Sequence, residues 1–157
     1  MSTAVLVCGK ICAGKTIYAK SLALQCKAVL LSCDEITLLF GQHLGERHDE
    51  IVEKTQKYLL EKAAELLAKS VNIILDWGFW TQVERNEATA FFTARGFECE
   101  LHYVKVSDAV WCENLRRRNA AFTGADDDFY YIDEKTAAEF GKIFEPPIDY
   151  NVLYERD

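Results

Sequence analysis

The hydrophobic positions along this chain form short continuous runs separated by longer stretches with helical spacing. Continuous apolar runs predict strands buried on both faces, and they occur at residues 4–8, 27–32, 71–76 and 98–106. A further edge strand is expected at residues 148–154. The stretches between the runs predict helices at residues 16–24, 36–40, 49–69, 82–95, 108–118 and 133–144. This alternation predicts an α/β fold, in which a parallel sheet carries helices on both faces.

Capping signals define two of the expected helix boundaries. Thr81 and Glu84 have the spacing of a capping box. Ser107 or Asp108 is expected to cap the helix that follows the fourth strand. Residues 120–131 show little periodicity, and we expect them to form a mobile loop.

Size and composition are those of an ordinary globular protein. The chain has 157 residues, of which 50% are hydrophobic and 27% charged, enough for a single domain with a substantial core. It shows no run of about eighteen apolar residues and no signal peptide, so we expect a cytoplasmic protein without a membrane span. The six cysteines lack C-x-x-C spacing and are expected to be reduced thiols. A zinc site is not favoured, because the histidines lie near no paired cysteines.

The net charge of −7 argues against long nucleic acids as partners. An acidic surface repels a polynucleotide backbone unless a basic groove offsets the repulsion. The only dense basic cluster is the run Arg116, Arg117 and Arg118. A long polynucleotide is therefore disfavoured as a substrate.

One stretch carries a recognisable chemical motif between the first strand and the first helix. It fits G-x-x-x-x-G-K-[ST], the P-loop or Walker A pattern, and consists of Gly9, Lys10, Ile11, Cys12, Ala13, Gly14, Lys15 and Thr16. Its glycines let backbone N–H groups converge on phosphate oxygens, and the helix that follows presents its positive end. Lys15 would reach the β- and γ-phosphates of ATP, and Thr16 would hold Mg²⁺. The alternative is a chance match in a glycine-containing loop.

Two carboxylates end the second and third expected strands. Because open α/β sheets bind ligands at the carboxyl ends of their strands, Asp34 is predicted to orient an acceptor hydroxyl or accept its proton. Its structural alternative is an N-cap for a helix that starts at Glu35. Asp76 is predicted to contact Mg²⁺ through water or to bind the acceptor, since a carboxylate that ends an apolar strand needs a partner. Its alternative is a turn residue before Gly78.

Aromatic residues and an arginine follow Asp76. Trp77, Phe79 and Trp80 are expected in a turn, either as part of the core or as a stacking platform for the acceptor. Alternation places Trp77 and Phe79 on one side of the chain. Arg85 either binds the acceptor or a phosphate, or forms a surface salt bridge with a neighbouring glutamate.

Together these motifs resemble the small P-loop kinase family of AAA-type ATP-binding proteins. That family includes polynucleotide 5′-kinases, zeta-toxin-like kinases and antibiotic phosphotransferases. The resemblance rests on the Walker A stretch, on Ser32-Cys33-Asp34-Glu35-Ile36, on Asp76 with Arg85, and on Trp111 through Asn119. It implies a three-layer P-loop NTP-hydrolase-like fold with sheet order 2-3-1-4-5. Asp34 and Asp76 would then face the phosphate loop from adjacent strand ends.

The resemblance also implies a lid at about residues 115–132. Arg118 at the lid hinge has the best family match for a catalytic and nucleotide-binding arginine, and Arg117 is next. Three consecutive helical residues point about 100° apart, so Arg116, Arg117 and Arg118 cannot all face the nucleotide. The alternative is a solvated helix end that complements the helix dipole. The acidic run at 126–128 is expected to be a solvated loop, with attraction of a cationic acceptor as its alternative.

The resemblance and the motifs predict a Mg²⁺- and ATP-dependent kinase that phosphorylates a hydroxyl of a small-molecule or nucleotide-like acceptor. Polynucleotide kinases carry an arginine three residues after the equivalent of Asp34, where this chain has Thr37. That departure and the acidic surface disfavour the first alternative, a 5′-polynucleotide kinase. The second alternative is a nucleotide-binding regulatory or toxin-like module without a metabolic kinase role.

Overall fold

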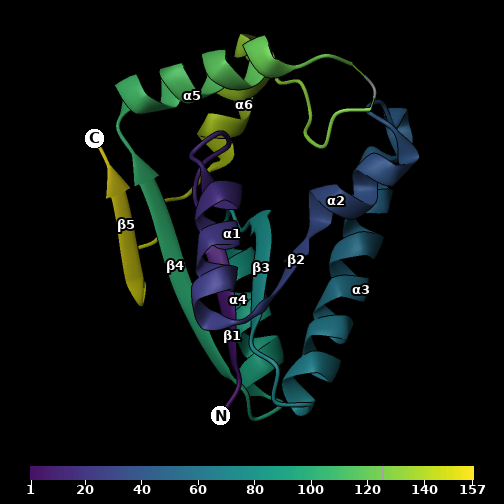
Figure 1. The fold of residues 1–157 in the computed structure, drawn as a ribbon, viewed down its shortest axis with the longest axis vertical. Helices are drawn as coiled ribbons and strands as arrows, with labels where there is room; N and C mark the ends of the chain where they lie inside the picture. The colour runs from purple at the N-terminus through teal and green to yellow at the C-terminus, as the bar shows by residue number, and fades with distance from the viewer. Residues whose placement is uncertain (125) are drawn as a thin grey trace.

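The computed structural model describes residues 1–124 and 126–157 and consists of one five-stranded sheet with helices around it (Figure 1). The strands are β1 Thr3–Cys8, β2 Val29–Ser32, β3 Ile73–Gly78, β4 Glu98–Val106 and β5 Val152–Arg156. The α-helices are α1 Lys15–Cys26, α2 Cys33–Thr37, α3 His48–Ala68, α4 Gln82–Thr93, α5 Asp108–Ala121 and α6 Glu134–Ile143. Two 3₁₀ turns, η1 Leu38–Phe40 and η2 Gly45–Arg47, lie between α2 and α3.

All strand pairs are parallel, and the strand order is β2-β3-β1-β4-β5. Both the parallel sheet and the order 2-3-1-4-5 are confirmed. Because all five strands run the same way, their carboxyl ends meet at one edge of the sheet, the upper edge in Figure 1. Any residue that follows a strand is therefore delivered to that edge.

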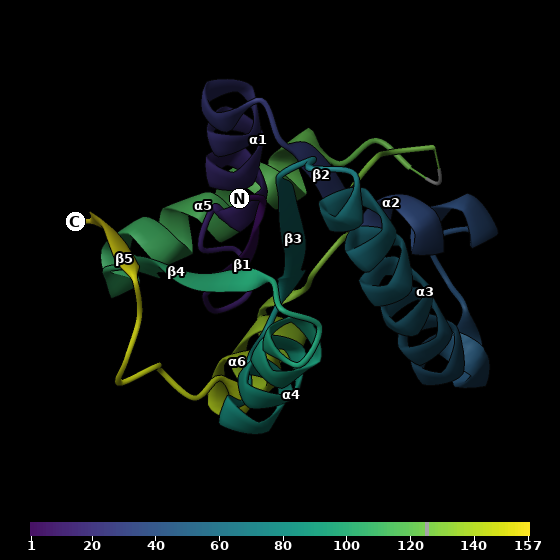
Figure 2. The same cartoon turned by 90° about the horizontal axis from the view of Figure 1, so that it is seen from below.

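The alternation of side chains along β1 explains how the sheet holds two helical layers. Ala4, Leu6 and Cys8 are fully buried against α3 and α4, in a cluster that includes Ala63 and Phe92. The intervening β1 side chains pack on the opposite face, against α1 and α5. Viewed from below, α1 lies on one side of the sheet and α4 and α6 on the other (Figure 2). Burial of both faces accounts for the continuous apolar character of the strands.

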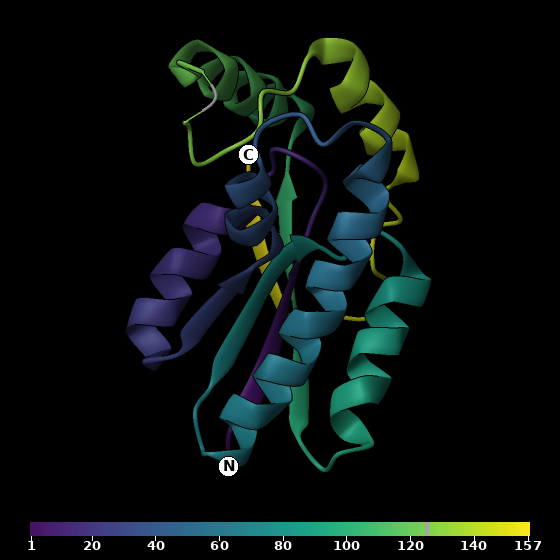
Figure 3. The same ribbon diagram turned by 90° about the vertical axis from the view of Figure 1, so that its right-hand side faces the viewer.

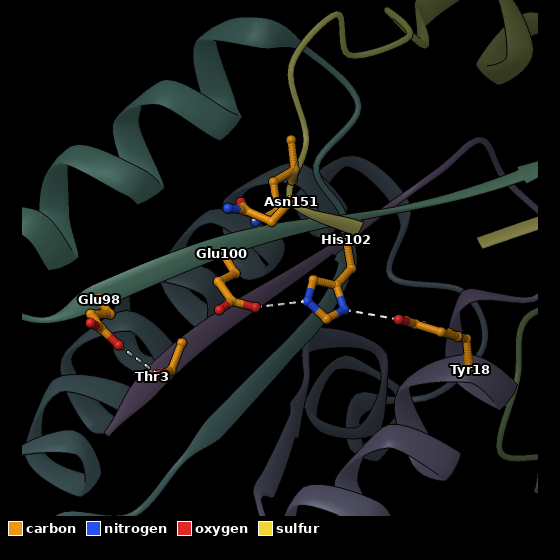
Figure 4. A network of polar contacts seen from close by, with 7 residues as sticks. Thr3, Tyr18, Glu98, Glu100, His102 and Asn151 are labelled. Atoms are coloured by element: carbon orange, nitrogen blue, oxygen red, sulfur yellow. Dashed lines mark hydrogen bonds and ion pairs between the residues drawn. The ribbon is translucent and has the colours of Figure 1, made fainter. Parts of the chain in front are cut away.

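A polar network attaches α1 to the sheet. The hydroxyl of Tyr18 on α1 lies 2.9 Å from Nδ1 of His102 on β4, and Nε2 of that ring lies 3.1 Å from a carboxylate oxygen of Glu100 (Figure 4). The ring of Tyr18 also packs on Tyr154 of β5, with centroids 4.8 Å apart. These contacts fix the orientation of the helix whose first turn follows the P-loop.

A third cluster lies above the upper edge of the sheet. Ile11 of the P-loop packs with Leu115 of α5, Ile132, and Ala137 of α6. The chain between α5 and α6 crosses from there toward α2, as Figure 3 shows from the side. The top of the molecule is therefore built from segments that surround the strand ends.

The structure corrects the predicted bounds of three strands by two residues or more. The second strand begins at Val29 rather than at residue 27. The third strand runs from Ile73 to Gly78, because β3 has a bulge at Trp77 beyond which Gly78 pairs with Cys8, so that the strand continues two residues past Asp76. The last strand is β5, Val152–Arg156, since Asn151 fixes its start by bonding the backbone of Leu101 at 2.8 Å in both directions. These shifts move Trp77 from the expected turn into β3.

The predicted caps are confirmed. Thr81 and Glu84 form a complete capping box at the start of α4, and the Ser107 hydroxyl accepts the N–H of Val110 at the start of α5. The mobility predicted for residues 120–131 remains a prediction, and Ala125 within that stretch lies outside the described residues. None of the helices in residues 1–124 and 126–157 combines the length and the apolar character that a membrane span requires.

Candidate active site

The Gly9–Thr16 stretch turns sharply between β1 and α1, as the motif predicts. Cys12 and Gly14 adopt positive φ angles of 60° and 90°, and the N–H of Ala13 bonds the carbonyl of Lys10 at 3.1 Å. Gly9 is required for a different reason, because a Cβ there would lie 2.5 Å from the carbonyl oxygen of Val104 in β4. The loop thus packs directly on the neighbouring strand.

Side chains of α5 hold the outer side of this loop. Nε1 of Trp111 donates to the carbonyl of Ile11 at 2.7 Å, and the amide of Asn114 donates to the carbonyl of Cys12 at 3.0 Å. The ammonium of Lys10 lies 4.4 Å from the centre of the Trp111 ring and 3.3 Å from Asp108. Three loop residues are therefore tied to one helix, which fixes the loop from outside.

Lys15 and Thr16 begin α1 and meet the end of β3. The hydroxyl of Thr16 donates to Oδ2 of Asp76 at 2.8 Å, and Nζ of Lys15 donates to the carbonyl of Lys10 at 2.8 Å, inside the loop. Loss of solvent lowers the pKa of the Lys15 ammonium, and the negative charge of Asp76 opposes that shift. The structure thus brings the predicted phosphate-binding lysine and both predicted metal-binding residues together.

Alternation along β3 explains why Asp76 points at Thr16. Asp76 lies two residues after Ile74, whose side chain packs on the α1 face of the sheet, and so its carboxyl points to that face as well. It is 5% exposed, and its backbone pairs with Val7 and Ser32 on the two neighbouring strands. A buried carboxylate held by one hydroxyl has further lone pairs available for a ligand.

Asp34 stands at the same edge, in the first turn of α2. The predicted alternative role as N-cap is wrong, because Ser32 is the cap and its hydroxyl accepts the N–H of Glu35 at 3.4 Å. Desolvation by the neighbouring protein raises the pKa of the Asp34 carboxyl, and the negative charge of Asp76 raises it further. Asp34 therefore lies close enough to Asp76 for the two charges to interact, and it does not cap α2.

The three consecutive arginines of α5 take different positions. Arg116 and Arg117 both pair with Glu113 at 2.9 Å, and their side chains are 77% and 74% exposed. Arg118 is half-buried, donates to the carbonyl of Tyr130 at 2.9 Å, and lowers the pKa of Asp34 by its charge. The structure brings Arg118 to the site and places Arg117, a predicted nucleotide-binding residue, in a surface ion pair.

The segment that follows α5 is fastened to the opposite side of the site. Nε2 of Gln42 donates to the carbonyls of Asp127 and Phe129 at 3.3 and 3.0 Å. The hydroxyl of Tyr130 donates to Oγ1 of Thr37 at 2.7 Å, and the charge of Asp34 contributes to the raised pKa of that tyrosine, after the larger effect of burial. Residues 127–130 therefore bridge from α5 to α2 beside Asp34, and we call them the strap.

The aromatic residues after Asp76 belong mostly to the core. The rings of Trp77 and Phe79 lie on one side, as predicted, with centroids 4.9 Å apart, and Phe79 is 3% exposed. Phe79 has a φ of 45°, so the turn there is strained. Trp80 packs on Phe140 of α6 at 5.1 Å. This packing favours the core alternative for Trp77 and Phe79 over the stacking platform.

Arg85 is neither on the surface nor in a salt bridge with a neighbouring glutamate. It is 2% exposed, and its guanidinium donates to the carbonyls of Phe79 and Trp80 at 2.8 and 3.1 Å and to Gln82 at 3.2 Å. Within the described residues, its Nε has no hydrogen-bond partner. The surface alternative is therefore wrong, and the contacts favour support of the 78–81 turn over binding of an acceptor.

Several residues that shape this site were not among the predicted site residues. Trp111 and Asn114 hold the loop, Tyr130 closes the strap, and Arg156 at the end of β5 reaches Gly14, where an added Cβ would lie 3.6 Å from its Nη1. For α5, the only sequence signal was the resemblance of residues Trp111 through Asn119 to the family. Nothing in the local pattern around Arg156 marks it, because its position depends on strand pairing.

The oxygen ligands at the site suit Mg²⁺. Among the described residues no group of three or more His, Cys, Asp or Glu could hold a metal ion, which gives no support to zinc. Mg²⁺ prefers hard oxygen ligands and is commonly held by one or two protein groups together with phosphate oxygens. The hydroxyl of Thr16 and the carboxylate of Asp76 form such a pair. The residues present therefore fit the predicted ion.

Comparisons with known proteins agree with this geometry. Residues 5–147 match the model of a family described as an AAA domain. The fold is similar to Chaetomium thermophilum Kti12 in complex with ADP-AlF3, with a TM-score of 0.74 and 15% identity over 98% of this chain and 88% of that chain. It is also similar to a gluconokinase from Sinorhizobium meliloti 1021, with a TM-score of 0.62 and 15% identity over 98% of this chain and 81% of that one.

A third similar structure comes from the Pnkp1/Rnl/Hen1 RNA repair complex, with a TM-score of 0.72 and 14% identity over 90% of this chain and 43% of that chain. A search among curated proteins gave no match. At such low identities these solved structures establish the fold alone, and the chemistry has to be inferred from the residues of the site.

Proposed function

This chain belongs to the AAA-domain family, and from that premise we propose that it is an ATP-dependent phosphotransferase acting on a hydroxyl of a small acceptor. The observation that carries the proposal is the convergence of four side chains at one sheet edge. Thr16 bonds Asp76 at 2.8 Å, and the charges of Asp76 and Asp34 both act on Lys15. A loop that only bound nucleotide would not need the second carboxylate.

The P-loop supplies the nucleotide end of the reaction. Its backbone N–H groups and the positive end of α1 would bind the β- and γ-phosphates of ATP, and Lys15 would balance their charge. Thr16 and Asp76 would hold Mg²⁺. The bound ion neutralises phosphate charge during transfer. Similarity to a gluconokinase and to Kti12 with ADP-AlF3 supports this assignment without identifying the acceptor.

Asp34 supplies the acceptor end. The acceptor oxygen forms a bond to the γ-phosphorus while the bond from that phosphorus to the β–γ bridging oxygen breaks, and ADP leaves. The acceptor proton passes to the Asp34 carboxylate, whose raised pKa makes it a better base than an ordinary aspartate. Arg118, which acts electrostatically on Asp34, would stabilise the charge of the transferred group.

The strap favours a small acceptor over a polynucleotide. Tyr130 bonds Thr37 and Gln42 bonds the strap backbone, so the space beside Asp34 is bridged by protein. Thr37 stands at the position where polynucleotide kinases carry an arginine. It is 1% exposed, and its hydroxyl accepts the hydrogen bond from Tyr130. An acidic protein of charge −7 adds repulsion for a polyanionic chain.

The direct test is phosphoryl transfer from labelled ATP. We expect label to move to one or more compounds in a set of small hydroxyl-bearing metabolites, and none to a single-stranded oligonucleotide with a free 5′-hydroxyl. Efficient labelling of the oligonucleotide would instead support the polynucleotide kinase alternative. Neither transfer, with nucleotide binding intact, would favour the regulatory module.

Replacing Asp76 by asparagine should raise the Mg²⁺ concentration needed for activity. The amide keeps the shape and a contact to Thr16 but removes the negative charge that favours a divalent cation. We expect the half-saturating Mg²⁺ concentration to rise at least about tenfold, as for loss of one charged ligand. The measurement is initial rate against Mg²⁺ at fixed ATP, with Asp149→Asn as the control at an exposed position outside the site. An unchanged Mg²⁺ curve in Asp76→Asn would contradict this role.

Replacing Asp34 by asparagine should lower kcat by about 100-fold or more, the usual worth of a general base. The affinity for ATP should change little, because Asp34 serves the acceptor. In the wild type, kcat/KM should fall as pH falls through the raised pKa of Asp34, and thus at a higher pH than the value near 3.9 of an ordinary aspartate. Stopped-assay rates over a pH series, with calorimetric ATP titrations, measure both effects. Full activity in Asp34→Asn would move the assignment to the regulatory module.

A further inference from the structure

Arg156 ends β5 at the same sheet edge as the P-loop. It pairs in register with Val106 of β4, and its carbonyl accepts the N–H of Ser107 at 3.0 Å. The tip of β5 lies below α5 in Figure 1, beside the chain terminus marked C. Both contacts lie on the β4 side, because β5 is the edge strand of the sheet, and they fix the backbone of Arg156 beside the start of α5.

The side chain of Arg156 reaches back to the phosphate loop. A Cβ added at Gly14 would lie 3.6 Å from Nη1 of Arg156. Gly14 is the residue before α1 and has no side chain to cap the helix. The guanidinium of Arg156 thus lies beside Gly14, the N-cap residue of α1.

This placement is electrostatically unfavourable without an anion. The N-terminus of a helix carries partial positive charge and is stabilised by acidic side chains, not by cations. The first turn of α1 contains no acidic residue, and it already holds the ammonium of Lys15. Two cations therefore meet the positive end of one helix.

Other cations at this edge have partners, and Arg156 has none within the described residues. Lys10 pairs with Asp108, and Arg117 pairs with Glu113. Arg156 is exposed to solvent, and within the described residues its guanidinium forms no ion pair and no side-chain hydrogen bond. Its donors are available to a ligand that carries negative charge.

The strand order indicates which part of a nucleotide would meet this guanidinium. The P-loop follows β1 at the centre of the sheet, Asp34 follows β2 at one edge, and Arg156 ends β5 at the other edge. A nucleotide that points its γ-phosphate at Asp34 extends its other end toward β5. The group next in line from the loop is the α-phosphate.

We propose that Arg156 is a further nucleotide-binding residue, whose guanidinium binds the α-phosphate from the β5 side. The proposal rests on the ATP binding proposed above. It assigns to β5 a cation that the arginine run of α5 was expected to supply. Arg117, which was expected to serve the nucleotide, lies instead in its pair with Glu113.

The test compares AMP, ADP and ATP binding to the wild type, Arg156→Gln and Lys20→Gln by calorimetry in the presence of Mg²⁺. Because all three nucleotides carry the α-phosphate and AMP has no β-phosphate, Arg156→Gln should weaken all three by the same factor, about tenfold for one charge-assisted hydrogen bond. Lys20→Gln removes a positive charge from the exposed side of α1 and should leave all three affinities unchanged.

The outcomes separate this inference from the function it rests on. Equal weakening of AMP, ADP and ATP supports the α-phosphate assignment. Weakening of ADP and ATP with unchanged AMP would place Arg156 at the β-phosphate and overturn it. Loss of ATP affinity alone would place Arg156 at the γ-phosphate and overturn it. Unchanged affinities in Arg156→Gln, with weakened binding in Lys15→Ala, would overturn the inference and leave the proposed function standing. A wild type that binds none of the three nucleotides overturns both.

A stability measurement excludes a merely structural role. Without nucleotide, Arg156→Gln relieves the repulsion at the start of α1, so its melting temperature should equal or slightly exceed that of the wild type. With saturating ADP the wild type should gain more than the variant. A melting temperature several degrees lower in the nucleotide-free variant would show that Arg156 supports the fold, and would contradict the proposal.

Discussion

Replacing Lys15 by alanine is expected to lower kcat/KM for phosphoryl transfer by about 100- to 1000-fold or more. Loss of one positioned donor to developing charge costs about 3–4 kcal/mol in transition-state stabilisation. Nζ of Lys15 lies inside the loop, 2.8 Å from the carbonyl of Lys10, and is surrounded by protein that lowers its pKa. A charge in that setting interacts more strongly with phosphate than one in open water.

The matched control is Lys20→Ala, which removes a lysine from the exposed side of the same helix. Both variants should melt near the wild-type temperature, since neither lysine packs in the hydrophobic core. Steady-state rates at several ATP concentrations measure the effect. Near wild-type transfer in Lys15→Ala, after removal of contaminating kinases, would show that the P-loop is not the phosphate site.

Replacing Arg85 by alanine is expected to destabilise the protein by about 3 kcal/mol or more. The variant leaves the carbonyls of Phe79 and Trp80 without their donor, and each buried unsatisfied group costs about 1–3 kcal/mol. It also removes a large, fully buried side chain and leaves a cavity. For a domain of this size the melting temperature should fall by roughly 6–12 °C.

The control for Arg85 is Arg95→Ala on the same stretch of chain. Arg95 is exposed and pairs with Glu61 at 3.5 Å, so its loss should cost about 1 kcal/mol or less. Thermal and urea unfolding measure both variants. Assays below the melting temperature also separate the two roles of Arg85. A variant of wild-type stability that had lost only affinity for the acceptor would restore the substrate-binding prediction.

The elements near the P-loop could be predicted from local sequence patterns. Residues 9–16, the strand before them and the helix after them follow from a continuous apolar run and a motif with a fixed spacing, and the structure places all three as predicted. The capping box of Thr81 and Glu84 is equally local. Asp34 and Asp76 were predicted to lie at the same edge of the sheet because the carboxyl ends of parallel strands meet there.

Two of the errors share a cause, which is dependence on partners distant in sequence. The extension of β3 through Trp77 depends on its pairing with β1, which continues to Gly78 past a bulge at Trp77, and the start of β5 depends on Asn151 meeting Leu101. No short window of the sequence contains both members of either pair. Arg85 differs, because its partners Phe79, Trp80 and Gln82 are close in sequence, and only the fold of the 78–81 turn decides that they face its guanidinium.

The sequence by itself determined the fold class, the strand order implied by its family resemblance, and the loop that ends in Lys15 and Thr16. The fold class and the loop arise from short-range periodicity and backbone freedom at glycine, whereas the strand order was implied by the resemblance alone. Only the tertiary structure decided which cations face the site. Arg117 turns to Glu113, Arg118 reaches Tyr130, and Arg156 arrives beside Gly14. The direction of a long charged side chain is set by the partners within its reach. Glu113 lies one helical turn from Arg117, but Tyr130 and Gly14 come near Arg118 and Arg156 only in the folded chain.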